Sequence, residues 1–395
     1  MTPFAGSFTQ QEPIPEAAIA AAVAVMRSGR LHRYNLAPGE TGAAAALEAA
    51  FADWQGAPYC LACASGGAAM AIALRAAGIG PGDRVLTNGF TLAPVPGAIA
   101  AVGAEPVLAE ITEDLVVDLD DVAAKLGSVR PRAMLLSNMR GHLCDMDALA
   151  GLCARAAVPL IEDCAHTMGA TWRGRKSGGF GLAGCFSTQT YKHMNSGEGG
   201  LLVSSDAGFM ARATVLSGSY MLYGRHGAGP DADAFAGARL DMPNTSARMD
   251  NLRAALLLPQ LAALDGNLAR WNERHDRIAA RLARVPGLRL PLRPDAEGHV
   301  GSSIQFALPG RDPERMEAVV ERAAALGVEL KWFGAPEPRG FTSAHGSWRY
   351  VPRQDLPRTD AVLAVLLDMR IPLTFTPEDC DHVAEIVAHC VAEAR

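Results

Sequence analysis

Two short segments of the chain carry side chains that together could support chemistry on an amine. Lys192 ends a polar turn that begins at Ser187 and leads toward a run of glycines. Asp163 comes directly after an apolar stretch typical of a buried strand, and His166 follows three residues later. A buried lysine is costly to keep charged, so its pKa falls and its neutral amine can form a Schiff base with an aldehyde.

A lysine amine and an aspartate carboxylate are the two groups that pyridoxal 5'-phosphate (PLP) requires of an enzyme that moves amino groups. The chain holds only four lysines, which makes it less probable that one of them stands in this turn by chance. Ordinary structural alternatives exist: a surface lysine for Lys192, a turn or helix-capping aspartate for Asp163, and a core histidine for His166. We predict Lys192 as the catalytic residue, Asp163 at the ring nitrogen and His166 at the ring oxygen.

A phosphate group needs backbone N–H donors, and the segment that opens on Ser65, Gly66 and Gly67 offers them. These small residues lead into an expected helix, whose N-terminal dipole favours an anion. Ser187 could donate a further hydroxyl. The alternative is a tight strand-to-helix turn that binds no ligand.

Alternating strand and helix patterns from about residue 56 to 205 indicate the α/β class, with a mostly parallel sheet covered by helices on both faces. Strands are expected at Arg84–Asn88, Glu105–Ile111, Arg132–Ser137 and Val158–Glu162. Helices are expected at Ser65–Ala77, Pro94–Val102, Asp118–Leu126 and Asp145–Ala156. Ligands of such sheets bind beyond the carboxyl ends of the strands, where Asp163 and Ser65 both fall.

The C-terminal third has a different pattern. Residues 248–284 are expected to be largely helical, with a kink at Pro259 and with Leu257, Leu261, Leu264 and Leu268 on one face. From about Gly301 the pattern predicts strand, helix, strand, helix: Ser302–Leu308, Pro313–Leu326, Val328–Phe333 and Pro377–Ala394, the last capped by Thr376. We predict a large PLP-binding domain of residues 1–262 and a smaller α+β domain of residues 263–395, with loops at Tyr223–Phe235 and Pro336–Tyr350.

Composition narrows the class of protein. Hydrophobic residues make up 49% of the chain, charged residues 20%, and the net charge is −6, which argues against a nucleic-acid partner. The most apolar stretch, Leu92–Ala109, contains three prolines and a glutamate, so no membrane span is expected. Eight scattered cysteines and the lack of a leader-like N-terminus favour a cytoplasmic protein with reduced thiols.

Two motifs in the sequence are expected to carry no chemistry. Residues 179–184 fit the spacing G-x-G-x-x-G of dinucleotide sites, but a charged turn precedes them and a strand-like segment follows. Cys60 and Cys63 form a single C-x-x-C with no second pair, so no metal site is predicted.

An ordered series of motifs resembles the DegT-type (DegT/DnrJ/StrS, sugar aminotransferase) family of PLP enzymes of fold type I. The series runs through residues 80–83, 103–107, 141–146, 162–166, 187–192, 197–200 and 248–261, nearly the whole chain. In that family the lysine matching Lys192 forms the Schiff base, the aspartate matching Asp163 pairs with the ring nitrogen, and the residue matching His166 contacts the ring oxygen.

The same resemblance implies that Ser187 and the turn at Gly66 and Gly67 hold the phosphate. It also implies a homodimer with shared active sites, in which Asn244 or Ser246 reaches the phosphate of the partner subunit. A structural alternative is that both residues cap the helix that follows.

Three positions depart from the family pattern. Gly67 stands where a threonine is usual, which removes one phosphate hydroxyl, and Ser246 stands where an asparagine is usual. Leu92 replaces the aromatic residue that stacks on the ring. Phe90 is close by, but its side chain should point the other way in an extended segment.

We predict an aminotransferase that takes an amino group from glutamate or glutamine, leaving pyridoxamine phosphate (PMP), and passes it to a ketone or aldehyde. The resemblance points to a nucleotide-linked keto-sugar or an aminocyclitol ketone, and Gln189 is similar to the cyclitol branch. Dehydration of a deoxysugar is disfavoured because that branch has histidine in place of Lys192. One alternative is a PLP-dependent aminotransferase that acts on a non-sugar small ketone or amine. A non-catalytic, PLP-binding regulatory protein is the alternative from another class, and no DNA-binding motif supports it.

Overall fold

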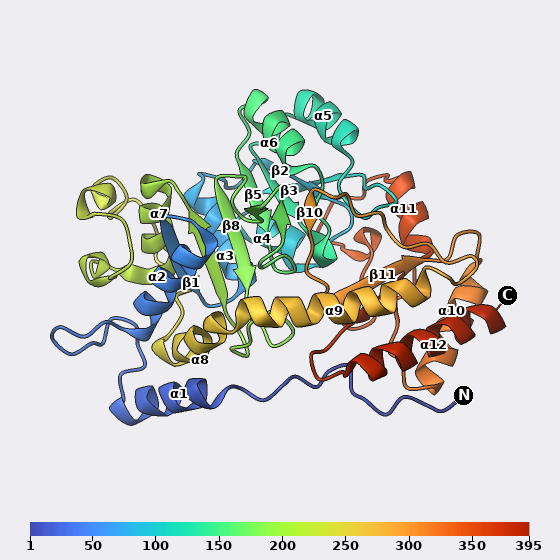
Figure 1. The fold of residues 1–395 in the computed structure, drawn as a ribbon. Coiled ribbons are helices and arrows are strands. Elements are labelled where there is room, and N and C mark those ends of the chain that lie inside the picture. The colour runs from blue at the N-terminus through green and yellow to red at the C-terminus, as the bar shows by residue number, and fades with distance from the viewer. Residues whose placement is uncertain (395) are drawn as a thin grey trace.

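The computed structural model describes residues 1–394 and places a mostly parallel sheet at the centre of the larger part of the fold (Figure 1). Across these residues the sheet has seven strands, in the order β1-β9-β8-β5-β4-β2-β3. Neighbours from β8 to β3 run parallel, whereas β9 runs antiparallel to both β8 and β1. The strands are β1 Tyr59–Cys63, β2 Arg84–Asn88, β3 Glu105–Ala109, β4 Ala133–Ser137, β5 Leu160–Asp163, β8 Ala183–Ser187 and β9 Gly200–Ser204. The predicted α/β class with a seven-stranded, mostly parallel sheet is confirmed.

Helices cover both faces of this sheet. Val85, Leu135 and Ile161 pack on one face against α3, α4 and α7, while Leu86 and Leu160 pack on the other against α5 and α6. Because successive side chains of a strand point to opposite faces, strands covered on both sides are apolar almost throughout. The helices here are α2 Ala43–Gln55, α3 Gly66–Ala76, α4 Pro94–Ala101, α5 Leu119–Ser128, α6 Met146–Arg155 and α7 Ala207–Thr214.

Side chains at the helix N-termini fix where several of these helices begin. Ser65 Oγ accepts the N–H of Ala68 at 3.0 Å at the start of α3, and Asp145 caps α6 in the same way. Such caps satisfy N–H groups that have no acceptor within the helix. Because such capping residues can be recognised in the sequence, the predicted helices and strands of residues 65–163 differ from the observed ones by only one or two residues at their ends.

Two consecutive helices connect the large sheet to the C-terminal part. They are α8 Asn251–Ala262 and α9 Leu264–Leu282, and the break between them lies at Ala263. Pro259 lies inside α8, so the predicted position of the kink was a few residues early. The predicted leucine face is confirmed, because Leu257, Leu261 and Leu264 are buried in one cluster with Leu268 beside them.

The C-terminal part forms a three-stranded antiparallel sheet with strand order β11-β13-β12. Its strands are β11 Ser303–Ala307, β12 Lys331–Trp332 and β13 Leu366–Arg370, and its helices are α10 Pro313–Ala325, α11 Pro357–Ala364 and α12 Pro377–Glu393. Thr376 caps α12 in a capping box, as predicted. The sequence analysis predicted neither α11 nor β13, the central strand. The signal for β13 is weak because the carboxyl of Asp368 interrupts a short apolar run.

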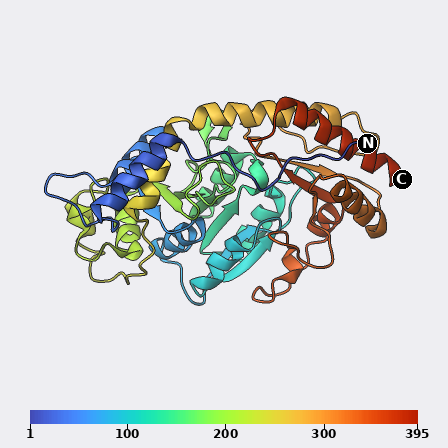
Figure 2. The same cartoon turned by 90° about the horizontal axis from the view of Figure 1, so that it is seen from below.

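The N-terminal residues cross from one part of the molecule to the other. Phe4 and Phe8 pack with Phe375 in the core of the C-terminal part, and Phe4 N–H donates to Leu326 O at 2.8 Å. Helix α1, Glu16–Ser28, then lies beside α8 (Figure 2). We propose that the two domains divide between α8 and α9, as the sequence suggested, with this N-terminal segment bridging them.

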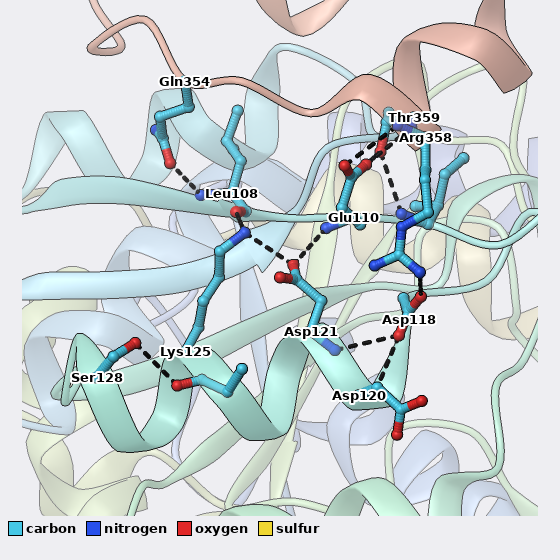
Figure 3. A network of polar contacts seen from close by, with 12 residues as sticks. Leu108, Glu110, Asp118, Asp120, Asp121, Lys125, Ser128, Gln354, Arg358 and Thr359 are labelled. Carbon is cyan, nitrogen blue, oxygen red and sulfur yellow. Dashed lines mark hydrogen bonds and ion pairs between the residues drawn. The ribbon is translucent and has the colours of Figure 1, made fainter.

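A network of polar contacts attaches α11 to the edge of the large sheet (Figure 3). The buried carboxylate of Glu110, just after β3, accepts hydrogen bonds from the backbone and hydroxyl of Thr359 at 2.7 and 2.6 Å and from Arg358 N–H at 3.2 Å. Gln354 Oε1 accepts the N–H of Leu108 at 2.8 Å. A carboxylate at the N-terminus of α11 complements the helix dipole, so this contact anchors the small sheet to the large one.

Three short strands form a separate small sheet: β6 Thr171–Trp172, β7 Arg175–Lys176 and β10 Glu297–Gly298. All eight cysteines are buried and free. Every helix within residues 1–394 is too short or too polar to span a bilayer.

Candidate active site

The carboxyl ends of β4, β5 and β8 meet the N-terminus of α3 around a cavity of about 380 Å³. This is the edge of the sheet where the sequence placed the site. Six predicted residues line the cavity together: Gly66, Gly67, Asp163, His166, Ser187 and Lys192. Its volume falls within the usual range for sites that hold a cofactor or substrate.

Lys192 is partly buried in the polar turn after β8 and lines the cavity. Loss of hydration and the nearby charge of Arg140 together lower the pKa of its ammonium group from 10.5 to about 7, although Asp163 acts in the opposite direction. A substantial fraction of the side chain is therefore a neutral amine at pH 7, and most of it is neutral at mildly alkaline pH; the neutral amine is the form that attacks a carbonyl carbon.

The hydrogen bonds of His166 fix which of its ring nitrogens carries the proton. Its Nδ1 faces the backbone N–H of Arg140 at 3.3 Å, and an N–H can only donate, so Nδ1 is the acceptor. The proton of the neutral ring is then on Nε2, which lies 2.7 Å from Lys192 Nζ and donates to it. Burial also holds the pKa of His166 well below its usual value. Two independent features, the low pKa of Lys192 and the orientation of His166, thus favour a neutral amine.

Asp163 points into the same cavity from the end of β5. Its Oδ2 accepts from Ser137 Oγ at 3.1 Å, and its Oδ1 accepts from the N–H of Ala165 at 3.1 Å. Burial raises the pKa of its carboxyl, and these two hydrogen bonds and Lys192 lower it in part. Ser137 in turn accepts from Thr91 Oγ1 at 2.8 Å, so a chain of hydroxyls holds the carboxylate in place.

The first turn of α3 and Ser187 lie side by side in the lining of the cavity. The N–H groups of Gly66 and Gly67 belong to a helix N-terminus, where backbone donors have no acceptor within the helix. A Cβ on Gly66 would lie 2.9 Å from the Cβ of Ser187, so glycine is required for the helix to approach this strand end so closely. The arrangement makes a small anion-binding recess.

These residues fit PLP at three separate places. A buried carboxylate with a raised pKa needs a cationic partner, such as a protonated ring nitrogen. A helix N-terminus with a hydroxyl beside it suits a phosphate group. The amine of Lys192 lines the same cavity, and its neutral form suits the aldehyde.

A cationic group at the mouth of the cavity was not predicted from the sequence. Arg140 Nη2 forms a buried ion pair with Asp368 Oδ2 at 2.9 Å, and Arg370 Cζ lies 3.9 Å above the ring of Tyr191. Lys331 lies near the same charges, and burial lowers its pKa to about 8. Among the described residues here, three basic side chains face the buried carboxylate of Asp368 and the exposed carboxylate of Glu329, which leaves a smaller excess of positive charge.

Sequence signals for these residues differ. Ser137 ends a predicted strand, so its place at the site could have been inferred. Arg140 adopts a left-handed conformation (φ 55°, ψ 22°), which is uncommon for a residue other than glycine and carries no mark in the sequence. Arg370 lies on β13, the strand that the sequence did not predict.

The side chains of Leu92 and Phe90 point in the directions expected from the sequence. Leu92 lines the cavity, whereas the ring of Phe90 is buried against Phe333, 5.0 Å between centroids. The aliphatic side chain of Leu92 is therefore the one that faces the cofactor space.

Asn244 and Ser246 are exposed and lie outside the cavity lining formed by residues 1–394 of this chain. They bond to each other, with Ser246 N–H donating to Asn244 Oδ1 at 2.8 Å. Any role of these two residues at a phosphate therefore depends on a second copy of the chain.

The glycine-rich motif at residues 179–184 is a turn before β8, as predicted. Its N–H groups are occupied by the buried carboxylate of Glu162, which accepts from Gly178, Phe180 and Gly181 at 2.7 to 3.1 Å. A nucleotide phosphate would have to displace this side chain, so the motif serves the fold.

Comparison with known proteins identifies the family of this chain. A sequence model of the DegT/DnrJ/EryC1/StrS aminotransferase family matches residues 14–388. L-glutamine:2-deoxy-scyllo-inosose aminotransferase of Streptomyces fradiae is 32% identical over 345 residues, 86% of this chain and 80% of the relative. L-glutamine:scyllo-inosose aminotransferase of Streptomyces griseus is 35% identical over 284 residues, 71% of this chain and 66% of the relative. The crystal structure of 3-amino-5-hydroxybenzoic acid synthase has a TM-score of 0.83 at 26% identity, over 100% of both chains.

The mostly parallel sheet, the likeness to a solved synthase structure over its whole length and the family match together define a PLP-dependent aminotransferase of fold type I. The chain belongs to the DegT/DnrJ/EryC1/StrS aminotransferase family. The predictions of family, enzyme class and cofactor are thereby confirmed. Solved structures of the same fold include both the PLP and the PMP form.

Proposed function

We propose that this chain transfers an amino group from glutamine or glutamate to the ketone of a small, polyhydroxylated ring. The observation that carries the proposal is the amine of Lys192, 2.7 Å from His166 Nε2, in one cavity with Asp163. When bound there, PLP supplies an electron sink that stabilises negative charge at the α-carbon of the amino donor.

The residues of the cavity would hold the cofactor at its two ends. Asp163 would pair with the ring nitrogen and keep it protonated, and His166 would donate its Nε2 proton to the ring oxygen. The N–H groups of Gly66 and Gly67, with the hydroxyl of Ser187, would bind the phosphate.

Lys192 has a second role as the residue that moves a proton. An amine with a pKa of about 7 is close to the ideal strength for a general base at neutral pH. Its Nζ would accept the proton that leaves the α-carbon of the donor and later return one to the product.

The cationic mouth of the cavity supports an amino acid as the donor. Arg140, Arg370 and Lys331 together exceed the negative charge of the two nearby carboxylates, so a carboxylate is attracted to this place. Arg370 lines the cavity. Within residues 1–394, no carboxylate lies at salt-bridge distance from its guanidinium group. We propose it as the side chain that binds the carboxylate of the donor.

The acceptor is proposed from charge and from relatives. A second cavity of about 380 Å³ adjoins the first and shares Tyr191, Phe341 and Arg370 with it. Its charged lining is balanced between Lys331, Arg339, Arg370 and Glu317, Glu329, Glu337. With no net positive charge among these six side chains, the lining does not favour a nucleotide diphosphate, whereas a neutral cyclitol ketone needs no such charge. The two Streptomyces relatives are named for cyclitol ketones, and Gln189 lines the first cavity here.

A half-reaction assay tests this function. The purified protein should bind PLP and absorb as a Schiff base, and L-glutamine or L-glutamate should convert it to the PMP form. A keto-cyclitol such as scyllo-inosose should restore the PLP form, and a nucleotide-linked keto-sugar should do so far more slowly. Lys192→Ala should remain folded and lack both steps. A protein that binds PLP but reacts with no amino donor would instead support the regulatory alternative.

We also propose a homodimer with shared sites. Asn244 and Ser246 lie at the surface, and the same region exposes the side chains of Tyr220 and Met221. Helix α1 adds exposed Met26 to the apolar surface available for contact. A two-fold dimer would bring Asn244 and Ser246 of each copy to the phosphate end of the other reciprocally.

Complementation tests the shared site. Subunits with Lys192→Ala are mixed with subunits that carry Asn244→Ala and Ser246→Ala, then unfolded and refolded together. In a mixed dimer one site receives both defects and the other neither, so activity should rise above that of either parent. Sedimentation of a fully active monomer would contradict the proposal.

A reducing, cytoplasmic location is proposed from the cysteines. All eight are free thiols, and burial raises the pKa of several of them, for example that of Cys153 to about 11. Thiols kept in this form fit a reducing compartment.

A further inference from the structure

A second cluster of potential ligands lies on α9, away from the Lys192 cavity. His275 and Asp276 are consecutive on this helix, and His299 follows β10. His275 Nδ1 is 3.1 Å and His299 Nε2 is 3.4 Å from Asp276 Oδ1. One ligand atom from each residue lies within 4.8 Å of the others. Tetrahedral bonds of about 2.1 Å separate neighbouring ligand atoms by about 3.4 Å, so small adjustments would suffice for one ion.

Two ring nitrogens of the cluster face Asp276. His275 Nδ1 contacts Asp276 Oδ1 at 3.1 Å, and it would present a lone pair to an ion in the tautomer that carries the proton on Nε2. His299 Nε2 is buried and forms no hydrogen bond to any of residues 1–394, which is rare for a ring nitrogen.

The cluster is held in place before any ion binds. Asn272, one turn before His275, donates to His299 O at 2.9 Å and accepts from the N–H of Gly301 at 2.8 Å. A Cβ on Gly301 would lie 2.3 Å from the Cβ of His275, so glycine allows this segment to lie directly on α9. The two imidazole rings are 4.8 Å apart between centroids. A preorganised set of ligands loses little entropy on binding.

The neighbouring charges leave Asp276 available to a cation. Arg293 lines the same cavity, of about 360 Å³, but pairs with Glu297 at 2.6 Å. His142 is engaged by Gln305 at 2.8 Å. The carboxylate of Asp276 is 65% exposed, so water can reach the remaining coordination positions of an ion.

We propose that His275, Asp276 and His299 bind a divalent first-row transition-metal ion of the Zn²⁺, Co²⁺ and Ni²⁺ class. Two imidazoles and one carboxylate favour these ions over Mg²⁺ and Ca²⁺, which prefer oxygen ligands throughout. The ion would link α9 to the segment after β10. The site shares no lining residue with the Lys192 cavity among the described residues, so it stabilises the fold and takes no part in amino transfer.

The test uses the full chain loaded with PLP, without a histidine tag and after removal of metal by a chelator. Calorimetric titration with Zn²⁺ should show one ion per chain, and Co²⁺ should give the visible absorption of a tetrahedral complex. The melting temperature should rise with Zn²⁺ and stay constant with Mg²⁺. The eight cysteines are buried, so thiols of the folded protein do not compete.

Variants distinguish Zn²⁺ binding at this site from Zn²⁺ binding by other histidines of the chain. His299→Gln and Asp276→Asn should each weaken Zn²⁺ binding by at least tenfold and abolish the rise in melting temperature. His389→Gln, an exposed histidine on α12, serves as the matched control and should bind like the parent. Stoichiometric binding that persists in His299→Gln and Asp276→Asn, or no binding at millimolar Zn²⁺, would overturn the proposal. Amino transfer in His299→Gln should equal that of the parent, so the result is independent of the proposed function.

Discussion

Replacing Lys192 with methionine should stabilise the cofactor-free protein, and by more in acid than in alkali. Burial lowers the pKa of Lys192 from 10.5 to about 7 in the folded state. Between these two values the unfolded chain binds a proton that the folded chain does not. Proton binding then favours the unfolded state, and the loss of stability grows as the pH falls toward the folded pKa. Methionine has a similar shape and no charge, so it removes this cost.

The magnitude follows from the two pKa values. At about 1.4 kcal/mol per pKa unit, the cost is about 2 kcal/mol near pH 9 and about 5 kcal/mol near pH 6. Methionine also loses the hydrogen bond from His166, about 1 kcal/mol, but only where the amine is neutral and can accept it, so this loss applies near pH 9 and adds to the difference in the same direction. A difference of at least about 3 kcal/mol between the two conditions is therefore the diagnostic quantity.

Denaturant unfolding of the cofactor-free protein measures this difference directly. Free energies of unfolding are compared for the parent and Lys192→Met near pH 6 and near pH 9. The pH dependence that other titrating groups contribute is the same in both proteins and cancels in the difference. Lys192→Arg is the control, because arginine cannot lose its charge and should destabilise the protein in both. An equal gain in acid and alkali, or a less stable methionine variant in acid, would refute the assignment of a neutral amine.

Three further predictions concern cofactor and substrate. Asp163→Ala should weaken retention of PLP and slow turnover by orders of magnitude, with Asp163→Glu intermediate at best; PLP dissociation and single-turnover rates measure both, and an unchanged rate would place the nitrogen partner elsewhere. Gly66→Ala should raise the Kd for PLP about tenfold, about 1.4 kcal/mol, because its Cβ would lie 2.9 Å from Ser187. Gly67→Ala is the matched control, since its nearest contact would be at 3.8 Å, and equal effects of the two would contradict the recess. Arg370→Met should raise KM for glutamine about tenfold through loss of a charge-assisted contact, with little change in KM for the ketone; steady-state kinetics with both substrates decide.

The sequence predicted the elements around the site well because their signals are local. Apolar strands that end in Asp163 and Ser187, and small residues that open α3 after Ser65, follow from propensity and capping alone. The order of these elements then places their carboxyl ends at one edge of a parallel sheet.

The prediction was incomplete where position depends on contacts between distant segments. Arg370 reaches the cavity only because β13 pairs between β11 and β12, and β13 has a buried carboxylate at its centre. Arg140 acquires its place from a left-handed backbone and from its ion pair with Asp368 on that strand. No local pattern specifies either contact.

The sequence by itself thus determined which functional groups are present and on which ends of which elements they stand, since these depend on neighbouring residues. Only the tertiary structure decided their chemical state. The pKa of Lys192, the protonated nitrogen of His166 and the approach of His299 to Asp276 all depend on atoms brought from far along the chain. Burial and charge act through space, so the same lysine in an exposed turn would remain a charged, unreactive ammonium.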